Sequence, residues 1–320
     1  MDAQKEAGTY HCMSRVVGAA FLLDDVGKEV LRRQLWALAE YCGLEVITYA
    51  IMSNHYHVLV RVPQKHVIED SRLLQAYRLL HPELNAWQER ALAMVEQDMP
   101  KNGDLAQRWR SRQLRQMFDV SQFNKLLKMR FSIWYNKTHK RLGTLWSERF
   151  KSVLVEDGEA LTTMAAYIDL NAVRAGIVSE PHLYRFCGYG EAVAGQSFAR
   201  RGLGLLSPGS WSETSEYYRG ILLGWMSAMR EGEQALPEEA VKMEAQHELR
   251  LPIFVRVSSR VRFLADGLVL GSAAFVRQKA ALVPGSRPRE PRGLLLRGLS
   301  GALHIADRLL PPREGPAVVC

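Results

Sequence analysis

Apolar and polar residues follow one another in patterns that predict three strands near the start of the chain. The three segments are short, apolar and rich in β-branched or aromatic residues: Thr9–Val16, Glu45–Ile51 and His55–Val62. A helix is expected between the first two, because four apolar residues recur on one helical face: Leu31, Leu35, Leu38 and Cys42. Asp24 or Asp25 can cap its start, and Gly43 can end it.

Longer helical patterns and one more strand follow, as far as Gly176. They are expected over residues 70–98 and 105–138, the strand Arg149–Glu156 and the helix Glu159–Ala175. The resulting order, β-α-β-β-α-β-α, predicts an α+β fold with a ferredoxin-like (RRM-like) βαββαβ sheet and its helices on one face. An extra helix carrying Tyr167 and a mainly helical C-terminal extension complete this prediction.

The composition changes after about residue 190 and predicts further domains. Glycine and serine are frequent up to residue 215, which predicts a linker over residues 191–215. A small, mainly helical module is expected over residues 216–282. The segment 283–320 is rich in proline, glycine and arginine, and we expect a poorly ordered basic tail there.

The net charge of +8 is concentrated in one block between Lys101 and Lys151. This block holds thirteen Lys or Arg residues but only three acids, a local net charge of +10 in 51 residues. Such a block favours a polyanion as partner, although a solvated helical face would show the same pattern. No apolar run is long enough for a transmembrane helix, so we expect no membrane segment. The start of the chain has no apolar signal-peptide core and the cysteines form no CxxC motif, so we expect a cytoplasmic location.

Two histidines on one strand form the first candidate for chemistry. His55 and His57 alternate with Tyr56, so their side chains leave the same face of the sheet, about 7 Å apart. Two neighbouring imidazoles can bind one divalent metal ion. They could equally be two histidines exposed on an open sheet face.

A second candidate lies on the predicted helix that follows the fourth strand. Tyr167 and Asn171 are four residues apart and share a helical face, with Arg174 near the helix end. They could act as nucleophile, metal ligand and phosphate clamp. The simpler alternative is a packed tyrosine, a polar residue in the last turn and an arginine that compensates the helix dipole.

Four motifs in a fixed order carry a resemblance to a known family. They are YHCMSR, MSNHYHVLV, GTLWSERFKSVLVE and YIDLNAVRAGIV, spread over residues 9–190. The chain resembles the REP-associated tyrosine transposases, within the single-tyrosine HUH transposases of the 200-type insertion sequences. The resemblance implies a catalytic domain over residues 1–190 that cuts and joins single-stranded DNA through a 5′-phosphotyrosine.

The resemblance also implies roles for individual residues. Tyr167 matches the nucleophile, while His55, His57 and Asn171 match the positions that hold Mg²⁺ or Mn²⁺. Many relatives have Asn-Pro-Val-Arg where this chain has Asn171-Ala-Val-Arg174, a change that affects the helix more than the chemistry. Hairpin-forming repeats as target, compatibility with a homodimer and a place at the bacterial nucleoid belong to the same expectation.

Expected DNA contacts combine cations with one aromatic residue, as single-strand binding requires. They are Arg108, Trp109, Arg110, Arg112, Arg115, Lys151 and Arg174. Trp109 can stack on a base or pack between helices. Two other functions stay open: a domesticated, non-catalytic module that binds single-stranded nucleic acid, and a metal-dependent nuclease that uses water in place of a tyrosine.

Overall fold

The computed structural model describes residues 7–229, 267–281, 292–294 and 303–307, which belong to two compact units. The first unit contains residues 1–150 and 165–215, and the second contains residues 151–164 and 216–320. Most of the predicted C-terminal tail, and residues 230–266 of the predicted helical module, lie outside the described residues.

An antiparallel sheet of three strands forms the centre of the first unit. The strands are β1 (Gly8–Arg15), β2 (Glu45–Ile51) and β3 (His55–Val62), in the order β2-β3-β1. The predicted strands are thus confirmed to within a residue, and the chain has the mixed helix-and-strand character expected of it. The β1–β3 register places Arg15 opposite His55 and Met13 opposite His57, so these side chains share one face.

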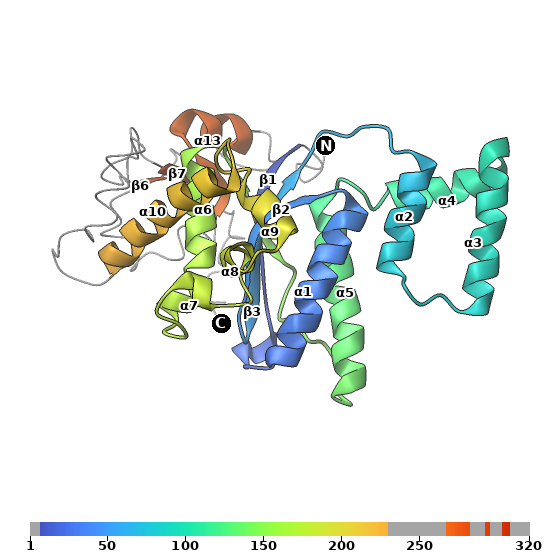
Figure 1. Cartoon of the computed structure of the whole chain (residues 1–320), viewed down its shortest axis with the longest axis horizontal. Helices are drawn as coiled ribbons and strands as arrows, with labels where there is room; N and C mark the ends of the chain where they lie inside the picture. The colour runs from blue at the N-terminus through green and yellow to red at the C-terminus, as the bar shows by residue number, and fades with distance from the viewer. Residues whose placement is uncertain (1–6, 230–266, 282–291, 295–302, 308–320) are drawn as a thin grey trace, which may run out of the picture. The chain divides into compact units, whose positions relative to one another are not determined.

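Two long helices, α1 (Asp25–Cys42) and α5 (Val120–Thr138), cover the opposite face of this sheet (Figure 1). The fully buried Tyr56 points toward them and donates a hydrogen bond of 3.1 Å to Asn124 Oδ1 on α5. The predicted ends of α1 are confirmed. Asp24 Oδ1 accepts from the backbone N–H of Gly27 at 2.7 Å, and Gly43 ends the helix with a φ of 65°.

The end of α6 (Glu159–Asp169) lies on the face that carries the histidines, where Tyr167 contacts His57. The chain continues through α7 (Asn171–Arg174), η4 (Pro181–Leu183), α8 (Gly188–Val193) and α9 (Ser197–Leu203), and α8 and α9 contact β2, the edge strand. Together these elements form a second helical layer. The buried Asp169 carboxylate joins this layer to the sheet: its Oδ1 accepts from the Thr48 hydroxyl at 2.7 Å and from the Tyr189 N–H at 3.1 Å. The single helix predicted over 159–175 is interrupted at Leu170, where ψ is 2°.

Residues 191–215, predicted as a linker, contain helical segments instead. They contain α9 and the start of α10 (Trp211–Met229). Gly202 shows why the glycine content was misleading: a Cβ on it would lie 2.1 Å from the carbonyl oxygen of Val46. The small residue is required for close contact between α9 and β2, so it does not indicate a flexible chain.

The two long helical regions predicted before residue 140 are divided into shorter helices. They comprise α2 (Asp70–Leu80), α3 (Ala86–Asp98), η3 (Met99–Lys101), α4 (Asp104–Leu114) and α5. A further short turn, η2 (Val17–Ala19), follows β1. Asn85 begins α3 with a capping box, in which its side chain accepts from the Gln88 N–H and the Gln88 side chain accepts from the Asn85 N–H. None of the helices that the structure describes could cross a membrane.

The second unit contains four further strands. They are β4 (Lys151–Val155), β5 (Gly267–Gly271), β6 (Arg292–Leu294) and β7 (Leu303–Asp307), paired in the order β4-β5-β7-β6. A short helix, α13 (Ala273–Ala280), follows β5. The segment predicted as a mainly helical module therefore contributes the strand β5, and the segment predicted as a poorly ordered tail contributes β6 and β7. Strand pairing uses backbone hydrogen bonds, so such short strands need no amphipathic pattern.

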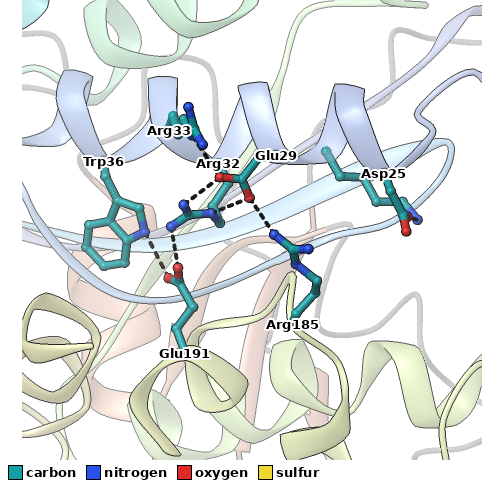
Figure 2. Close-up of polar contacts among 8 residues, drawn as sticks. Asp25, Glu29, Arg32, Arg33, Trp36, Arg185 and Glu191 are labelled. Atoms are coloured by element: carbon teal, nitrogen blue, oxygen red, sulfur yellow. Dashed lines mark hydrogen bonds and ion pairs between the residues drawn. The ribbon is translucent and has the colours of Figure 1, made fainter. Parts of the chain in front are cut away.

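An ion-pair network fixes α1 to the segment before and within α8 (Figure 2). Glu29 accepts from Arg32, Arg33 and Arg185 at 2.8–3.0 Å, and Arg32 also pairs with the buried Glu191. The indole N–H of Trp36 donates to Glu191 at 3.0 Å. The guanidinium of Arg32, followed by that of Arg33, lowers the pKa of Glu29 to about 2.

This network predicts an acid-dependent share of the stability of the first unit. Because the folded pKa of Glu29 is depressed, its contribution is present above the unfolded pKa and is lost as the pH falls toward about 2. Glu29→Gln should therefore lower the free energy of unfolding by roughly 1 kcal/mol at pH 7, and by less at pH 3. Urea unfolding of both proteins at the two pH values measures this, and an equal difference at both would contradict it.

Candidate active site

His55 and His57 lie on the sheet face against which the end of α6 packs. Their ring centroids are 5.1 Å apart and the ring planes are almost perpendicular, at 85°. The predicted common face is confirmed, but this face is covered rather than open: His57 is only 2% exposed, and His55 is partly buried. The histidines are therefore held in a protein interior.

A neighbouring side chain orients each of these imidazoles. His57 Nδ1 lies 2.8 Å from Nε2 of the buried His11, and His55 Nδ1 lies 2.6 Å from Asn54 Oδ1. These contacts leave Nε2 of each ring as the nitrogen that can bind a further ligand. His11 was not recognised from the sequence, because its place beside His57 depends on how β1 and β3 pair.

Tyr167 packs against the histidines. Its ring meets that of His57 edge-on at 5.7 Å and that of His11 at 6.2 Å, and only 2% of its surface is exposed. The Arg174 guanidinium lies over the Tyr167 ring, 4.0 Å from its centroid. The two candidate groups predicted from distant parts of the sequence thus come together on one face.

Asn171 completes the group from the start of α7. Its side chain raises the pKa of His55, and its Nδ2 is buried with no hydrogen-bond partner among the residues that the structure describes. An incompletely satisfied amide at this place is one that a bound ligand could engage through either end.

Burial and positive charge keep both histidines neutral. Burial, followed by the charge of Arg15, lowers the pKa of His55 to about 4, with Asn171 acting in the opposite direction. The pKa of His57 is also lowered, first by burial and then by His55, His11, Arg174 and Arg15. Neutral imidazoles are the form that binds metal ions.

Two arginines give this site a preference for anions. Burial lowers the pKa of Arg174 while the Tyr167 phenol raises it, and no described carboxylate pairs with this partly exposed cation. The exposed Arg15 stands opposite His55 in the strand register and also has no acidic partner within the described ranges. Uncompensated cations beside neutral imidazoles suit an anionic ligand such as a phosphodiester. Arg15 is a second site residue that the sequence did not reveal.

The side chains present also fit a divalent cation. Two imidazole nitrogens and an amide oxygen from Asn171 form a mixed nitrogen and oxygen set that Mg²⁺ or Mn²⁺ can accept. In the part of the chain that is described, no group of three or more His, Cys, Asp or Glu side chains is arranged to hold a metal ion. A metal at this site would therefore depend on Asn171 as its third ligand.

Of the four arginines of α4 and its end that are predicted to bind DNA, one forms an ion pair with an acidic residue and three form none within the described ranges. Arg108, Arg112 and Arg115 are exposed on α4 or at its end and form no ion pair with any described residue. Arg110 is occupied by Asp70, to which its Nε donates at 2.7 Å. The first three are therefore the cations of this helix that remain available to a polyanion.

The remaining two predicted contacts have other surroundings. Trp109 is only 8% exposed and meets Tyr77 edge-on at 5.7 Å, so of the two roles expected for it the structure shows the packing between helices. Lys151 begins β4 in the second unit.

Comparison with known proteins adds little to this geometry. No family model matches the chain, and no curated protein matches it. A solved structure of a REP-associated tyrosine transposase bound to a REP hairpin aligns with 59% of this chain and 81% of its own length. The identity is 14% and the TM-score 0.36, values that establish neither a common fold nor a common function.

The buried position of His55 predicts an unusual titration. In the folded chain with excess chelator, its imidazole should stay neutral at pH 7 and gain its proton with a midpoint near pH 4. Imidazole NMR signals, assigned with a His55→Gln variant, measure this midpoint. Histidines of the urea-unfolded chain should titrate near pH ~6.5. A folded midpoint at that unfolded value for His55 would contradict the buried, arginine-flanked site.

Proposed function

We propose that this protein cleaves and joins single-stranded DNA as a tyrosine transposase does, with Tyr167 as the nucleophile. The observation that carries the proposal is the contact of the Tyr167 ring with both the His57 ring and the Arg174 guanidinium. A phenol beside a neutral imidazole and an uncompensated cation is placed for attack on an anionic centre.

The reaction exchanges one phosphate ester for another. The Tyr167 oxygen forms a bond to phosphorus while the bond from phosphorus to the 3′ oxygen breaks, which gives a 5′-phosphotyrosine and a free 3′-OH. One proton leaves the phenol and one joins the departing 3′ oxygen. Because the number of ester bonds is unchanged, attack by another 3′-OH can reverse the step and join strands without a nucleotide cofactor.

Arg174 and Arg15 would bind the non-bridging oxygens of the reacting phosphate. Arg174 and Asn171 are partly exposed and Arg15 is exposed, whereas Tyr167 and His57 are buried. The DNA backbone would therefore enter from the Arg15 and Arg174 side. Mg²⁺ or Mn²⁺ held by His55, His57 and Asn171 would supply further positive charge to that phosphate.

The exposed cations of α4 would bind the DNA away from the reacting phosphate. One exposed face of α4 carries Arg108 and Arg112 and continues to Arg115 at the helix end. Leu105 lies on the same face, one turn before Arg108. Cations without acidic partners can meet successive phosphates and carry little sequence information. Hairpin-forming targets, a homodimer, a nucleoid location and a complete ferredoxin-like sheet stay predictions of the resemblance.

A non-catalytic module that binds single-stranded nucleic acid is the second candidate function. The observation in its favour is the 2% exposure of Tyr167, because a nucleophile must reach its substrate. A domesticated protein could retain the arginines while its tyrosine serves only to pack the helix on the sheet. A metal-dependent nuclease using water would need the histidines but not the phenol.

Tyr167→Phe distinguishes these functions. The variant loses one hydroxyl and keeps the ring contacts with His57 and Arg174, so we expect stability and strand binding close to those of the wild type. It should form no covalent adduct and cleave roughly a thousandfold or more slowly, since the nucleophile itself is absent. Denaturing gels of labelled single strands with Mg²⁺ or Mn²⁺ measure both.

The outcomes separate the three candidates. An adduct in the wild type alone supports the tyrosine mechanism. Cleavage that persists in Tyr167→Phe identifies the water-using nuclease. Binding without cleavage or adduct by either protein, with hairpin-bearing strands included, favours the non-catalytic module.

The α4 cations predict how binding depends on salt. The logarithm of the binding constant falls linearly with the logarithm of the salt concentration. For a single strand, each phosphate that a cation neutralises makes this slope more negative by about 0.7. Replacing Arg108, Arg112 and Arg115 together by alanine should therefore make the slope shallower by about 2. Arg110→Ala is the matched control: it removes a cation that Asp70 already neutralises, so its slope should change less. An unchanged slope in the triple variant would exclude α4 from the interface.

A further inference from the structure

One face of α3 exposes an aromatic residue, a cation and a methionine in a row. Trp87, Arg90 and Met94 are three and four residues apart, which places them along one side of the helix. Trp87 is 76% exposed and Met94 61%, and Arg90 is exposed too. We call these three residues the α3 stripe. The opposite side of α3 is buried through Leu92 and Val95, so the stripe is not needed to pack the helix.

The charges around the α3 stripe are arranged to leave it positive. Two acids of α3, Glu89 and Glu96, lie on its other side and face Arg78 of α2, at 3.6 and 2.8 Å. The third, Asp98, accepts a hydrogen bond from the backbone N–H of Ala106 at 2.9 Å. Arg90 has no ion pair with any residue in the described ranges. The stripe therefore combines one uncompensated cation with exposed apolar surface, while the neighbouring carboxylates are paired.

An exposed indole beside an unpaired cation fits a single-stranded nucleic acid better than it fits a second protein surface. A second protein surface would meet the apolar atoms but would have to supply an acid for Arg90. A strand of unpaired nucleotides supplies flat bases for the indole and phosphates for the guanidinium. The helix α4, which follows α3 in the chain after η3, adds the exposed cations Arg108, Arg112 and Arg115, so the charge of this region favours the polyanion.

Trp109, the tryptophan expected to stack on bases, is buried, whereas Trp87 presents its ring to solvent. An indole combines a flat apolar ring with an N–H donor, which is why tryptophan is enriched at contacts with partners. Trp87 thus has the accessibility that base stacking requires and Trp109 lacks.

We propose that the α3 stripe is a stacking surface for unpaired bases of single-stranded DNA, with Trp87 against a base and Arg90 against the adjoining phosphate. The choice of DNA as ligand rests on the proposed function, but the stacking itself does not require the Tyr167 reaction. The stripe would add a sequence-tolerant contact to the phosphate contacts of α4.

The test compares strands with and without bases. The full chain in excess EDTA is titrated with a fluorescent single-stranded oligonucleotide of mixed sequence, and with an oligonucleotide of the same length that is abasic throughout. Trp87→Ala should weaken binding to the first about tenfold, and should leave binding to the abasic strand almost unchanged. Trp87→Phe, which keeps a ring, should recover part of the affinity.

Ile133→Ala is the matched control, because Ile133 is 63% exposed on α5, outside the stripe. It should bind both strands as the wild type does. Equal effects of Trp87→Ala on both strands, or an effect of Ile133→Ala as large as that of Trp87→Ala, would overturn the proposal. Unchanged DNA binding with a lower oligomeric mass in Trp87→Ala would also overturn it and would assign the stripe to a second copy of the chain.

The failure of this inference is distinguishable from failure of the proposed function. A base-dependent decrease in the affinity of Trp87→Ala supports the stripe even if no tyrosine adduct ever forms. An adduct at wild-type level together with unchanged binding in Trp87→Ala removes the stripe and leaves the Tyr167 chemistry standing.

Discussion

The buried carboxylate of Asp169 is the contact on which the candidate site depends. It is fully buried, and it accepts hydrogen bonds from the Thr48 hydroxyl of β2 and from the Tyr189 N–H of α8. A carboxylate in such a place is costly unless its oxygens are satisfied, so these partners fix the end of α6 on the sheet. Tyr167 lies two residues earlier on the same helix and is thereby held against His57.

The buried position of the site explains the neutral state of its histidines and also limits the access of a substrate to Tyr167. Burial keeps His55 and His57 neutral, and no carboxylate among the described residues pairs with Arg174. Neutral imidazoles beside such a cation suit an anionic ligand. The same burial restricts access to Tyr167. Exposure of Arg15 at one border, and partial exposure of Arg174, provide a route by which a phosphate backbone could reach the buried phenol.

The sequence predicted what depends on local spacing and missed what depends on pairing between distant segments. Alternation placed His55 and His57 on one face, and a spacing of four placed Asn171 with Tyr167. His11 and Arg15 were missed because only the register of β1 and β3 brings them to the site. Trp109 was open to two roles because helical periodicity gives the faces of α4 but not which face is covered, and here Tyr77 covers its ring. Glycine near residue 202 indicated a linker, although it serves a close contact with Val46.

The most direct test of the account asks which atom of the wild-type protein becomes attached to DNA. The protein is incubated with a labelled single-stranded, hairpin-bearing oligonucleotide and Mn²⁺, denatured and digested, and the peptide that carries nucleotide mass is sequenced by tandem mass spectrometry. We predict a phosphodiester link to the 5′ end of the strand on Tyr167 alone. An adduct on any other tyrosine, or cleaved strands without any linked peptide, would contradict the assignment of Tyr167 as nucleophile.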